Sequence, residues 1–191
     1  MQKIIETVRD DFKPYYTVRF FTGMRTSEID GLRWQNVNFQ RREIYIKEAL
    51  VNGKLGDTKT FGSDRGIQMS ERVYQALLEQ KKMVKNRSEF VFSMRNGNPL
   101  DYRLVNRRVW HPLLRFLGLK SRRAYQTRHT AATLWLSAGE NPEWIAKQLG
   151  HSTTEMLFRV YSRYVPNITR RDGSAFELML EKLNEMENEY D

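Results

Sequence analysis

The segment AYQTRHTAATLWLSAG, residues 124–139, places Tyr125, Arg128 and His129 at the start of a predicted helix. The residues that follow are apolar at helical spacing: Ala131, Ala132, Leu134, Trp135 and Leu136. A charged pair at the entrance of an otherwise apolar helix needs a partner, because an unpaired charge is costly to remove from water. We therefore expect this helix start to belong to a functional site.

A second segment further along the chain, QLGHSTTEMLFRVYSRYVP (148–166), supplies a histidine and two tyrosines. Gly150 ends a predicted helix and His151 follows it directly. Tyr161 and Tyr164 lie three residues apart, which puts them on one face of the next helix. Taken alone, these residues also have an ordinary structural explanation, since a histidine after a helix-ending glycine is often a cap and helical tyrosines are often part of the core.

Two segments upstream carry further cations. In TGMRTSEIDGLRW (22–34), Arg25 lies at the start of a short predicted helix, and Glu28, three residues on, faces the same side. Such an arginine could bind phosphate while Glu28 holds its guanidinium, although an ordinary surface ion pair fits the spacing as well. In TKTFGSDRGIQM (58–69), Lys59 lies on a predicted hairpin, where it could reach into a groove or only protect a solvated strand edge.

The remaining pattern predicts an α+β fold that is mainly α-helical, with a small antiparallel three-stranded sheet inserted early. The alternation in EIYIKEALV (43–51) and the glycine-punctuated run after it predict the strands. Apolar spacing predicts two N-terminal helices separated near Pro14 and closed at Gly23, and a helix that follows Ser70. Three more helices are predicted, over 126–138, 142–149 and 153–164.

The length of 191 residues suits one core, and we predict one domain over residues 1–173 followed by an acidic amphipathic helix over 174–191. The tail carries six acidic side chains and one basic side chain, so the formal net charge of +9 leaves +14 on the first 173 residues. Its apolar stripe could dock on a neighbouring protomer, or it could fold back and shield the basic face of its own domain.

The composition favours a polyanionic partner, with double-stranded DNA the first candidate, because the sequence pI is about 9.8. The chain has no cysteine, and its three histidines, at positions 111, 129 and 151, lack the close pairing of metal-binding helices, so we expect no metal site. Neither a long apolar run nor the apolar core of a signal peptide is present, so we expect a cytoplasmic protein that does not contact membranes.

Taken together and in this order, the four segments resemble the catalytic domain of the tyrosine recombinases, the phage integrase family of enzymes that break and rejoin DNA. The resemblance rests on TGMRTSEIDGL, on TKT with Arg65 downstream, on R-H-T-x-A-T and on LGHS with tyrosines beyond it. It covers about residues 15 to 165. It implies the mainly helical recombinase fold, double-stranded DNA as the partner and a homo-oligomer assembled on that DNA.

The resemblance also implies a role for each matching residue. Arg25 and Arg128 would clamp the scissile phosphate, Lys59 would protonate the leaving 5′ oxygen, and His151 would donate a hydrogen bond to the phosphate. A tyrosine, for which we favour Tyr161, would attack and form a 3′-phosphotyrosyl enzyme. Because the bond energy stays in that intermediate, no nucleotide cofactor is required.

The sequence departs from the family pattern at two positions. Tyr125 stands where the family usually has a histidine, three residues before Arg128. A phenol is a poor base at neutral pH but can still hydrogen-bond a phosphate oxygen, so we expect Tyr125 to orient the phosphate. The spacing from His151 to Tyr161 is one residue longer than expected for the family, and Tyr164 lies further off still.

Three alternatives remain open at this point. The chain could be a noncatalytic DNA-binding module that has kept the recombinase fold, or it could break strands in the manner of a type IB topoisomerase. It could also be a basic helical RNA-binding protein, although no RNA-binding signature supports that assignment. Because family members normally carry DNA-binding modules ahead of this domain, we expect the chain to be either a fragment or a minimal member.

Overall fold

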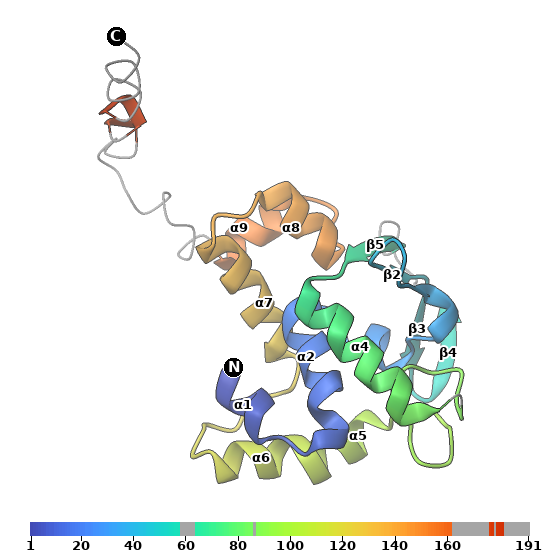
Figure 1. The fold of residues 1–191 in the computed structure, drawn as a ribbon. Helices are drawn as coiled ribbons and strands as arrows, with labels where there is room; N and C mark the ends of the chain where they lie inside the picture. Colours follow the sequence, from blue (N-terminus) through green and yellow to red (C-terminus); the bar gives the residue numbers. More distant parts are fainter. Residues whose placement is uncertain (58–63, 86, 162–175, 178, 182–191) are drawn as a thin grey trace.

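The computed structural model describes residues 1–57, 64–85, 87–161, 176–177 and 179–181 (Figure 1). Helices make up most of this part of the chain, and short strands occupy its first half. The α-helices are α1 (Gln2–Thr7), α2 (Lys13–Thr22), α3 (Thr26–Asp30), α4 (Glu71–Val84), α5 (Tyr102–Val105), α6 (His111–Phe116), α7 (Gln126–Ser137), α8 (Pro142–Leu149) and α9 (Thr154–Tyr161). The strands are β1 (Val37–Asn38), β2 (Glu43–Ile46), β3 (Glu48–Val51), β4 (Lys54–Asp57) and β5 (Arg65–Gln68). The predicted α+β class is confirmed.

Most helix boundaries follow local signals in the sequence. Gly23 ends α2 in the left-handed conformation, with φ of 61°, as predicted. The side chain of Ser70 accepts a hydrogen bond from the amide of Val73 and so caps α4. The predicted break near Pro14 was wrong, because this proline occupies the first turn of α2, where a missing N–H costs nothing, and α1 ends earlier, at Thr7.

The strands form two antiparallel sheets, so the predicted three-stranded sheet is present and a separate two-stranded hairpin accompanies it. One sheet has the order β1-β2-β5 and the other is the β3-β4 hairpin. The segment 43–51 divides because Ile44 and Ile46 of β2 are buried in the core, with β2 paired to β5, whereas β3 turns away to pair with β4. Asn52 and Gly53, both with positive φ, supply the tight turn of that hairpin.

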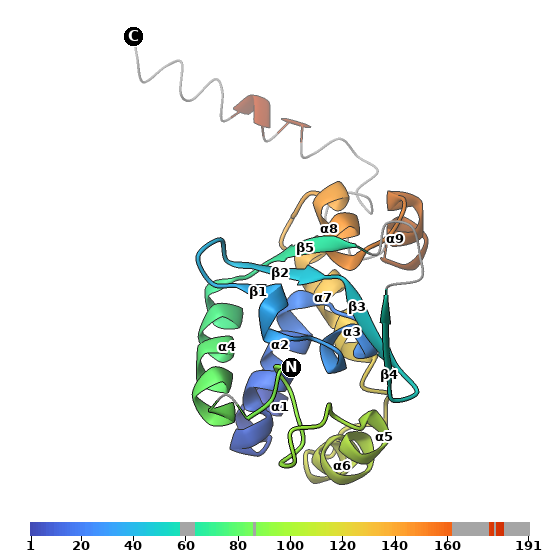
Figure 2. The same cartoon turned by 90° about the vertical axis from the view of Figure 1, so that its right-hand side faces the viewer.

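Two hydrophobic cores organise the described residues. The larger core joins α1, α2 and α4 with the three-stranded sheet and with the helical run of α5 and α6, while α7, α8 and α9 bury a smaller cluster of their own. Figure 2 shows β5 running beneath α8. Three hydrogen bonds between β5 and α8 fix this contact: Arg65 to the Gln148 carbonyl, the Gln68 amide to the Gln148 side chain, and Trp144 to the Gln68 side chain. The C-terminal end of α8 is therefore held where the two cores meet.

The predicted helix over 174–191 lies mostly outside the described residues. Five of its residues are described, and they are helical. Among them Phe176, Met179 and Leu180 are exposed. The division into a domain over 1–173 and a separate tail stays a prediction. No helix among the described residues is both long and apolar enough to cross a membrane.

Candidate active site

Three arginines from three different elements converge on the C-terminal end of α8. Arg65, Arg128 and Arg25 donate to the three consecutive carbonyls of 148–150, in that order, at 2.8, 2.7 and 3.1 Å. The last carbonyls of a helix have no partner within the helix and form the negative end of its dipole, so guanidinium groups stabilise them. Strand β5, helix α7 and the start of α3 are thereby joined around the residue that follows α8.

Glu28 holds two of these arginines. Its oxygens accept two hydrogen bonds from Arg65, at 3.0 and 2.9 Å, and one from Arg25 Nη1 at 2.8 Å. Burial alone would raise the pKa of Glu28, but the bonds to Arg65 and Arg25 outweigh burial and keep that pKa below its ordinary value. The predicted pairing of Arg25 with Glu28 is confirmed, and since the Glu28 side chain is only 2% exposed, it is not a surface ion pair.

Arg128 lies almost completely buried between α2 and α8. Its Nη1 donates to the Gly23 carbonyl at 2.8 Å and its Nη2 to the Leu149 carbonyl. Burial, together with the charges of Arg25 and Arg65, lowers the pKa of Arg128 to about 10, so it stays protonated at neutral pH. Three guanidinium groups thus face one carboxylate, and the excess of positive charge suits a bound anion such as a phosphodiester.

His151 directly follows this carbonyl cluster. Gly150, with φ of 67°, turns the chain out of α8 and presents the imidazole to the arginines. Burial lowers the pKa of His151 to about 4, and the charges of Arg128, Arg25 and Arg65 act in the same direction. The imidazole is therefore neutral at pH 7, and its buried Nδ1 has no hydrogen-bond partner among the described residues. A groove of about 480 Å³ opens beside it.

Three aromatic rings continue the site from α7 to α9. The Tyr125 and His129 ring centroids are 5.4 Å apart, and those of His129 and Tyr161 are 5.6 Å apart. The Tyr161 hydroxyl and His129 Nδ1 share a short hydrogen bond. Burial raises the pKa of Tyr161 to about 12, while the charge of Arg128 opposes that rise. The structure thus brings Tyr125, Arg128 and Tyr161 into one neighbourhood, whereas Lys59 and Tyr164 lie outside the described residues.

Sequence reasoning gave no role to two residues of this arrangement. The sequence alone marks Arg65 only as lying downstream of TKT, and His129 only as one of a charged pair. Their partners lie far along the chain, since Arg65 binds a carbonyl 83 positions away and His129 binds a hydroxyl 32 positions away. The sequence offers one signal for them: Arg65 in a strand and His129 on an apolar helix both lack a partner nearby in the sequence.

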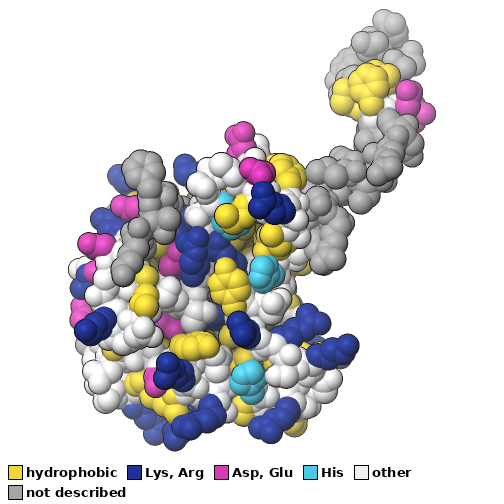
Figure 3. Space-filling model, turned by 180° about the vertical axis from the view of Figure 1, so that it is seen from behind, with side chains coloured by type: hydrophobic (Ala, Val, Ile, Leu, Met, Phe, Trp, Pro, Cys, Tyr) yellow, Lys and Arg dark blue, Asp and Glu magenta, His cyan; other side chains and the backbone are white. Residues whose placement is uncertain are grey.

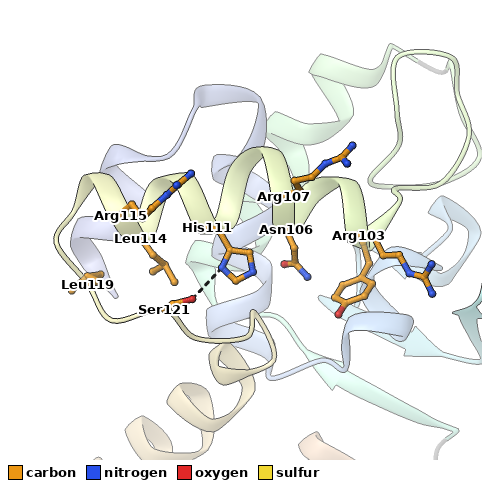
Figure 4. A pocket seen from close by; sticks show the side chains of 9 residues that line it. Arg103, Asn106, Arg107, His111, Leu114, Arg115, Leu119 and Ser121 are labelled. Carbon is orange, nitrogen blue, oxygen red and sulfur yellow. Dashed lines mark hydrogen bonds between the residues drawn. The ribbon is translucent and has the colours of Figure 1, made fainter.

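A second group of basic side chains lies on the helical run of α5 and α6. In the space-filling view, Lys and Arg side chains gather at the centre and along the lower edge of the face shown (Figure 3). A groove of about 570 Å³ lies on this helical run, and Arg103, Arg107 and Arg115 are among its lining residues (Figure 4). The His111 Nδ1 and the Ser121 hydroxyl close one side of the groove, 3.5 Å apart. The described residues contain no cluster of histidines and carboxylates that could hold a metal ion.

We expect Gly150→Ala to lower the free energy of unfolding by more than an alanine substitution at a glycine that has the same positive φ but open space around it. A Cβ at Gly150 would lie 2.9 Å from Arg65 Nη1, so strain and overpacking together would cost about 2–5 kcal/mol. Gly139→Ala is the matched control, because Gly139 also has positive φ but a Cβ there would meet nothing within 4 Å, and we expect a cost of about 1–2 kcal/mol. Urea unfolding of both variants measures the difference, and equal costs would contradict tight packing of Arg65 against Gly150.

Comparison with known proteins identifies the family of the chain. The model of the phage integrase family matches residues 3–167. The chain belongs to the phage integrase family. It is 25% identical over 189 residues to the prophage integrase IntR of Escherichia coli strain K12, an alignment that covers 86% of the chain and 46% of IntR. The tyrosine recombinase XerC-like protein of Caldanaerobacter subterraneus is 23% identical over 195 residues, covering 87% of the chain and 49% of that protein. The chain therefore spans about half the length of these relatives.

Solved structures share the fold at low sequence identity. The integrase of transposon Tn1549, in complex with a circular intermediate DNA, superposes with a TM-score of 0.76 at 22% identity, over 95% of this chain and 63% of that one. The recombinase XerA superposes with a TM-score of 0.69 at 20% identity, over 95% of this chain and 62% of that one. The predicted tyrosine recombinase fold of this phage integrase family member is thus confirmed.

Proposed function

We propose that the chain is the catalytic domain of a site-specific DNA recombinase of the integrase type. It cuts and rejoins double-stranded DNA through a 3′-phosphotyrosyl intermediate. The convergence of Arg25, Arg65 and Arg128 with a single carboxylate, directly before His151, is the observation that carries this proposal. The DNA bound to the Tn1549 integrase supports DNA as the partner.

In this mechanism Arg25 and Arg128 bind the nonbridging oxygens of the scissile phosphate. Arginine suits this task because its planar fork pairs with two oxygens and keeps its charge. Neutral His151 donates a hydrogen bond from its ring N–H to the same phosphate. These groups stabilise the charge that develops in the transition state.

The remaining groups act on the two oxygens that exchange at phosphorus. The Tyr161 hydroxyl attacks the phosphate, and Lys59 protonates the departing 5′ oxygen. Tyr125, whose ring lies against His129, orients the phosphate. Glu28 acts through Arg25 and Arg65, which it holds in place.

We further propose that the protein acts in the cytoplasm as a homo-oligomer assembled on paired DNA sites. The tail over 174–191 would dock on a neighbouring protomer. The exposed side chains of Phe176, Met179 and Leu180 support this assignment, because apolar groups on a helix are stabilised by a surface that covers them.

A nicked suicide substrate tests the proposed function. The nick lets a short fragment with a free 5′ hydroxyl diffuse away after cleavage, so the covalent protein–DNA adduct accumulates and can be scored on a denaturing gel. We expect an adduct linked through tyrosine on DNA that contains the recombination site of the protein. A noncatalytic module would bind without forming adduct, whereas a topoisomerase-like enzyme would relax supercoiled plasmids that lack the site.

The basic groove on α5 and α6 predicts a specific salt dependence of DNA binding. We expect the double substitution of Arg103 and Arg107 by alanine to weaken binding and to reduce the slope of log K against log salt by about 2, because each neutralised phosphate contributes about 0.9 to the slope. Lys82→Ala, at an exposed position on α4, removes one positive charge outside the groove and is the control. Fluorescence anisotropy at several salt concentrations measures the slopes, and an unchanged slope in the double variant would exclude this groove from the DNA contact.

A further inference from the structure

His129 occupies a position between two groups that the proposed mechanism already uses. It follows Arg128 on α7, and its Nδ1 shares a short hydrogen bond with the Tyr161 hydroxyl on α9. The His129 and Tyr161 rings are tilted by 50° at a centroid distance of 5.6 Å, and the edge of Tyr125 packs on His129 at 5.4 Å. The imidazole thus touches the atom that would attack phosphorus.

The surroundings of His129 keep its ring neutral. Burial and the adjacent Arg128 charge both lower the pKa of His129 below its ordinary value. The other titratable groups that face the ring are Tyr125, Tyr161 and His151. A neutral imidazole protonated on Nε2 has an acceptor at Nδ1, which is the atom that faces the hydroxyl.

Tyr161 requires such an acceptor. With a pKa of about 12, its phenol does not ionise on its own at neutral pH, and a phenol that keeps its proton is a weak nucleophile. The bond to His129 is the one hydrogen bond recorded for this hydroxyl in the described part of the chain.

The other candidate bases, His151 and Tyr125, are less well placed to take the proton of the Tyr161 hydroxyl. His151 has no recorded contact with Tyr161, and its Nδ1 is buried without a partner among the described residues. Tyr125 is itself a phenol and stands at the position where a histidine of the family would lie. A proton acceptor in contact with the nucleophile must therefore come from another position, and His129 is one turn further along the same helix.

We propose that His129 is the general base that removes the proton from the Tyr161 hydroxyl during strand cleavage. The inference rests on the proposed function, in which Tyr161 is the nucleophile. The Tyr161 oxygen forms its bond to phosphorus as the bond from phosphorus to the 5′ oxygen breaks. The phenolic proton passes to His129 Nδ1, and the 5′ oxygen takes a proton from Lys59. During rejoining the 5′ hydroxyl attacks phosphorus and gives its proton back to Lys59, and the imidazolium returns its proton to the departing tyrosine oxygen.

The test compares two nicked substrates that differ in one atom. In the second substrate, sulfur replaces the bridging 5′ oxygen, so the leaving group departs as a thiolate and needs no proton. We expect His129→Asn to slow single-turnover adduct formation by about 10²-fold or more on both substrates, because general base catalysis contributes about that much. Lys59→Ala should be slow on the oxygen substrate and restored on the sulfur substrate, since it affects only the leaving group.

A second variant separates proton transfer from structural support. His129→Ala leaves room beside Tyr161, and added imidazole is expected to restore adduct formation at least tenfold in a concentration-dependent manner. Thr130→Ala, at a neighbouring position on α7, should match the unsubstituted protein with and without imidazole. Thermal unfolding of each variant shows whether the fold is kept.

Four results would overturn the inference. A His129→Asn rate equal to that of the unsubstituted protein would exclude a base at this position, and a faster rate would mean that the contact restrains the tyrosine. Restoration of His129→Asn by the sulfur substrate would place His129 at the leaving group. Failure of imidazole to restore His129→Ala would assign the histidine a packing role. If the unsubstituted protein forms no adduct at all, the proposed function itself fails, and that outcome is distinct from the other four.

Discussion

Tyr161→Phe is expected to abolish covalent adduct on nicked DNA, whereas Tyr164→Phe is expected to leave most of it. Only a hydroxyl placed beside the three arginines can form the phosphotyrosyl ester. Tyr161 is near them, because the charge of Arg128 acts on its pKa and opposes the rise that burial causes. Phenylalanine fills the same space in the core of α7, α8 and α9, so only the hydrogen bond to His129 is lost. That loss should cost about 1 kcal/mol of stability.

The two variants control for each other, because each removes one phenolic hydroxyl and keeps the ring. Adduct should be scored under single-turnover conditions with saturating protein, and DNA binding should be measured separately to show that both variants still bind. Persistence of adduct in Tyr161→Phe together with its loss in Tyr164→Phe would assign the nucleophile to Tyr164 instead.

Local signals explain which parts of the fold could be predicted from the sequence. The helices over 126–138, 142–149 and 153–164 were predicted because apolar spacing, capping residues and glycines act within a few residues. Gly23 and Gly150 end helices in the left-handed conformation, as their positions indicated. The division of 43–51 into two sheets could not be predicted, because strand pairing depends on partners that the alternation itself does not specify.

The candidate site shows the same limit. The contact between Arg25 and Glu28 was predictable because side chains three residues apart on a helix lie next to each other. The hydrogen bond from Arg65 to the end of α8 was not predictable, because it depends on how β5 packs beneath a helix that lies some eighty residues later in the chain. The contact of His129 with Tyr161 likewise requires α9 to pack on α7. Residue types and order indicated the chemistry, but the pairing of groups came from the tertiary structure.

Arg128→Ala is expected to reduce the rate of strand cleavage by about 10²-fold or more, because in the proposed mechanism it removes a charged donor to the scissile phosphate. It should also cost about 1–3 kcal/mol of stability, since the carbonyls of Gly23 and Leu149 lose the guanidinium that joins them. Single-turnover adduct formation and urea unfolding measure the two effects. A near-normal cleavage rate would exclude Arg128 from the phosphate clamp.

Arg128→Lys separates the two roles, because a lysine keeps the charge but cannot bond both carbonyls and also present a planar fork to the phosphate. We expect it to recover part of the stability and little of the rate. Arg123→Ala removes the same charge at an exposed position just before α7, and at saturating protein it should cleave at the normal rate. If Arg128→Lys cleaved as fast as the unsubstituted protein, positive charge alone would suffice at this position, and the bonds from Arg128 to α2 and α8 would serve only the fold.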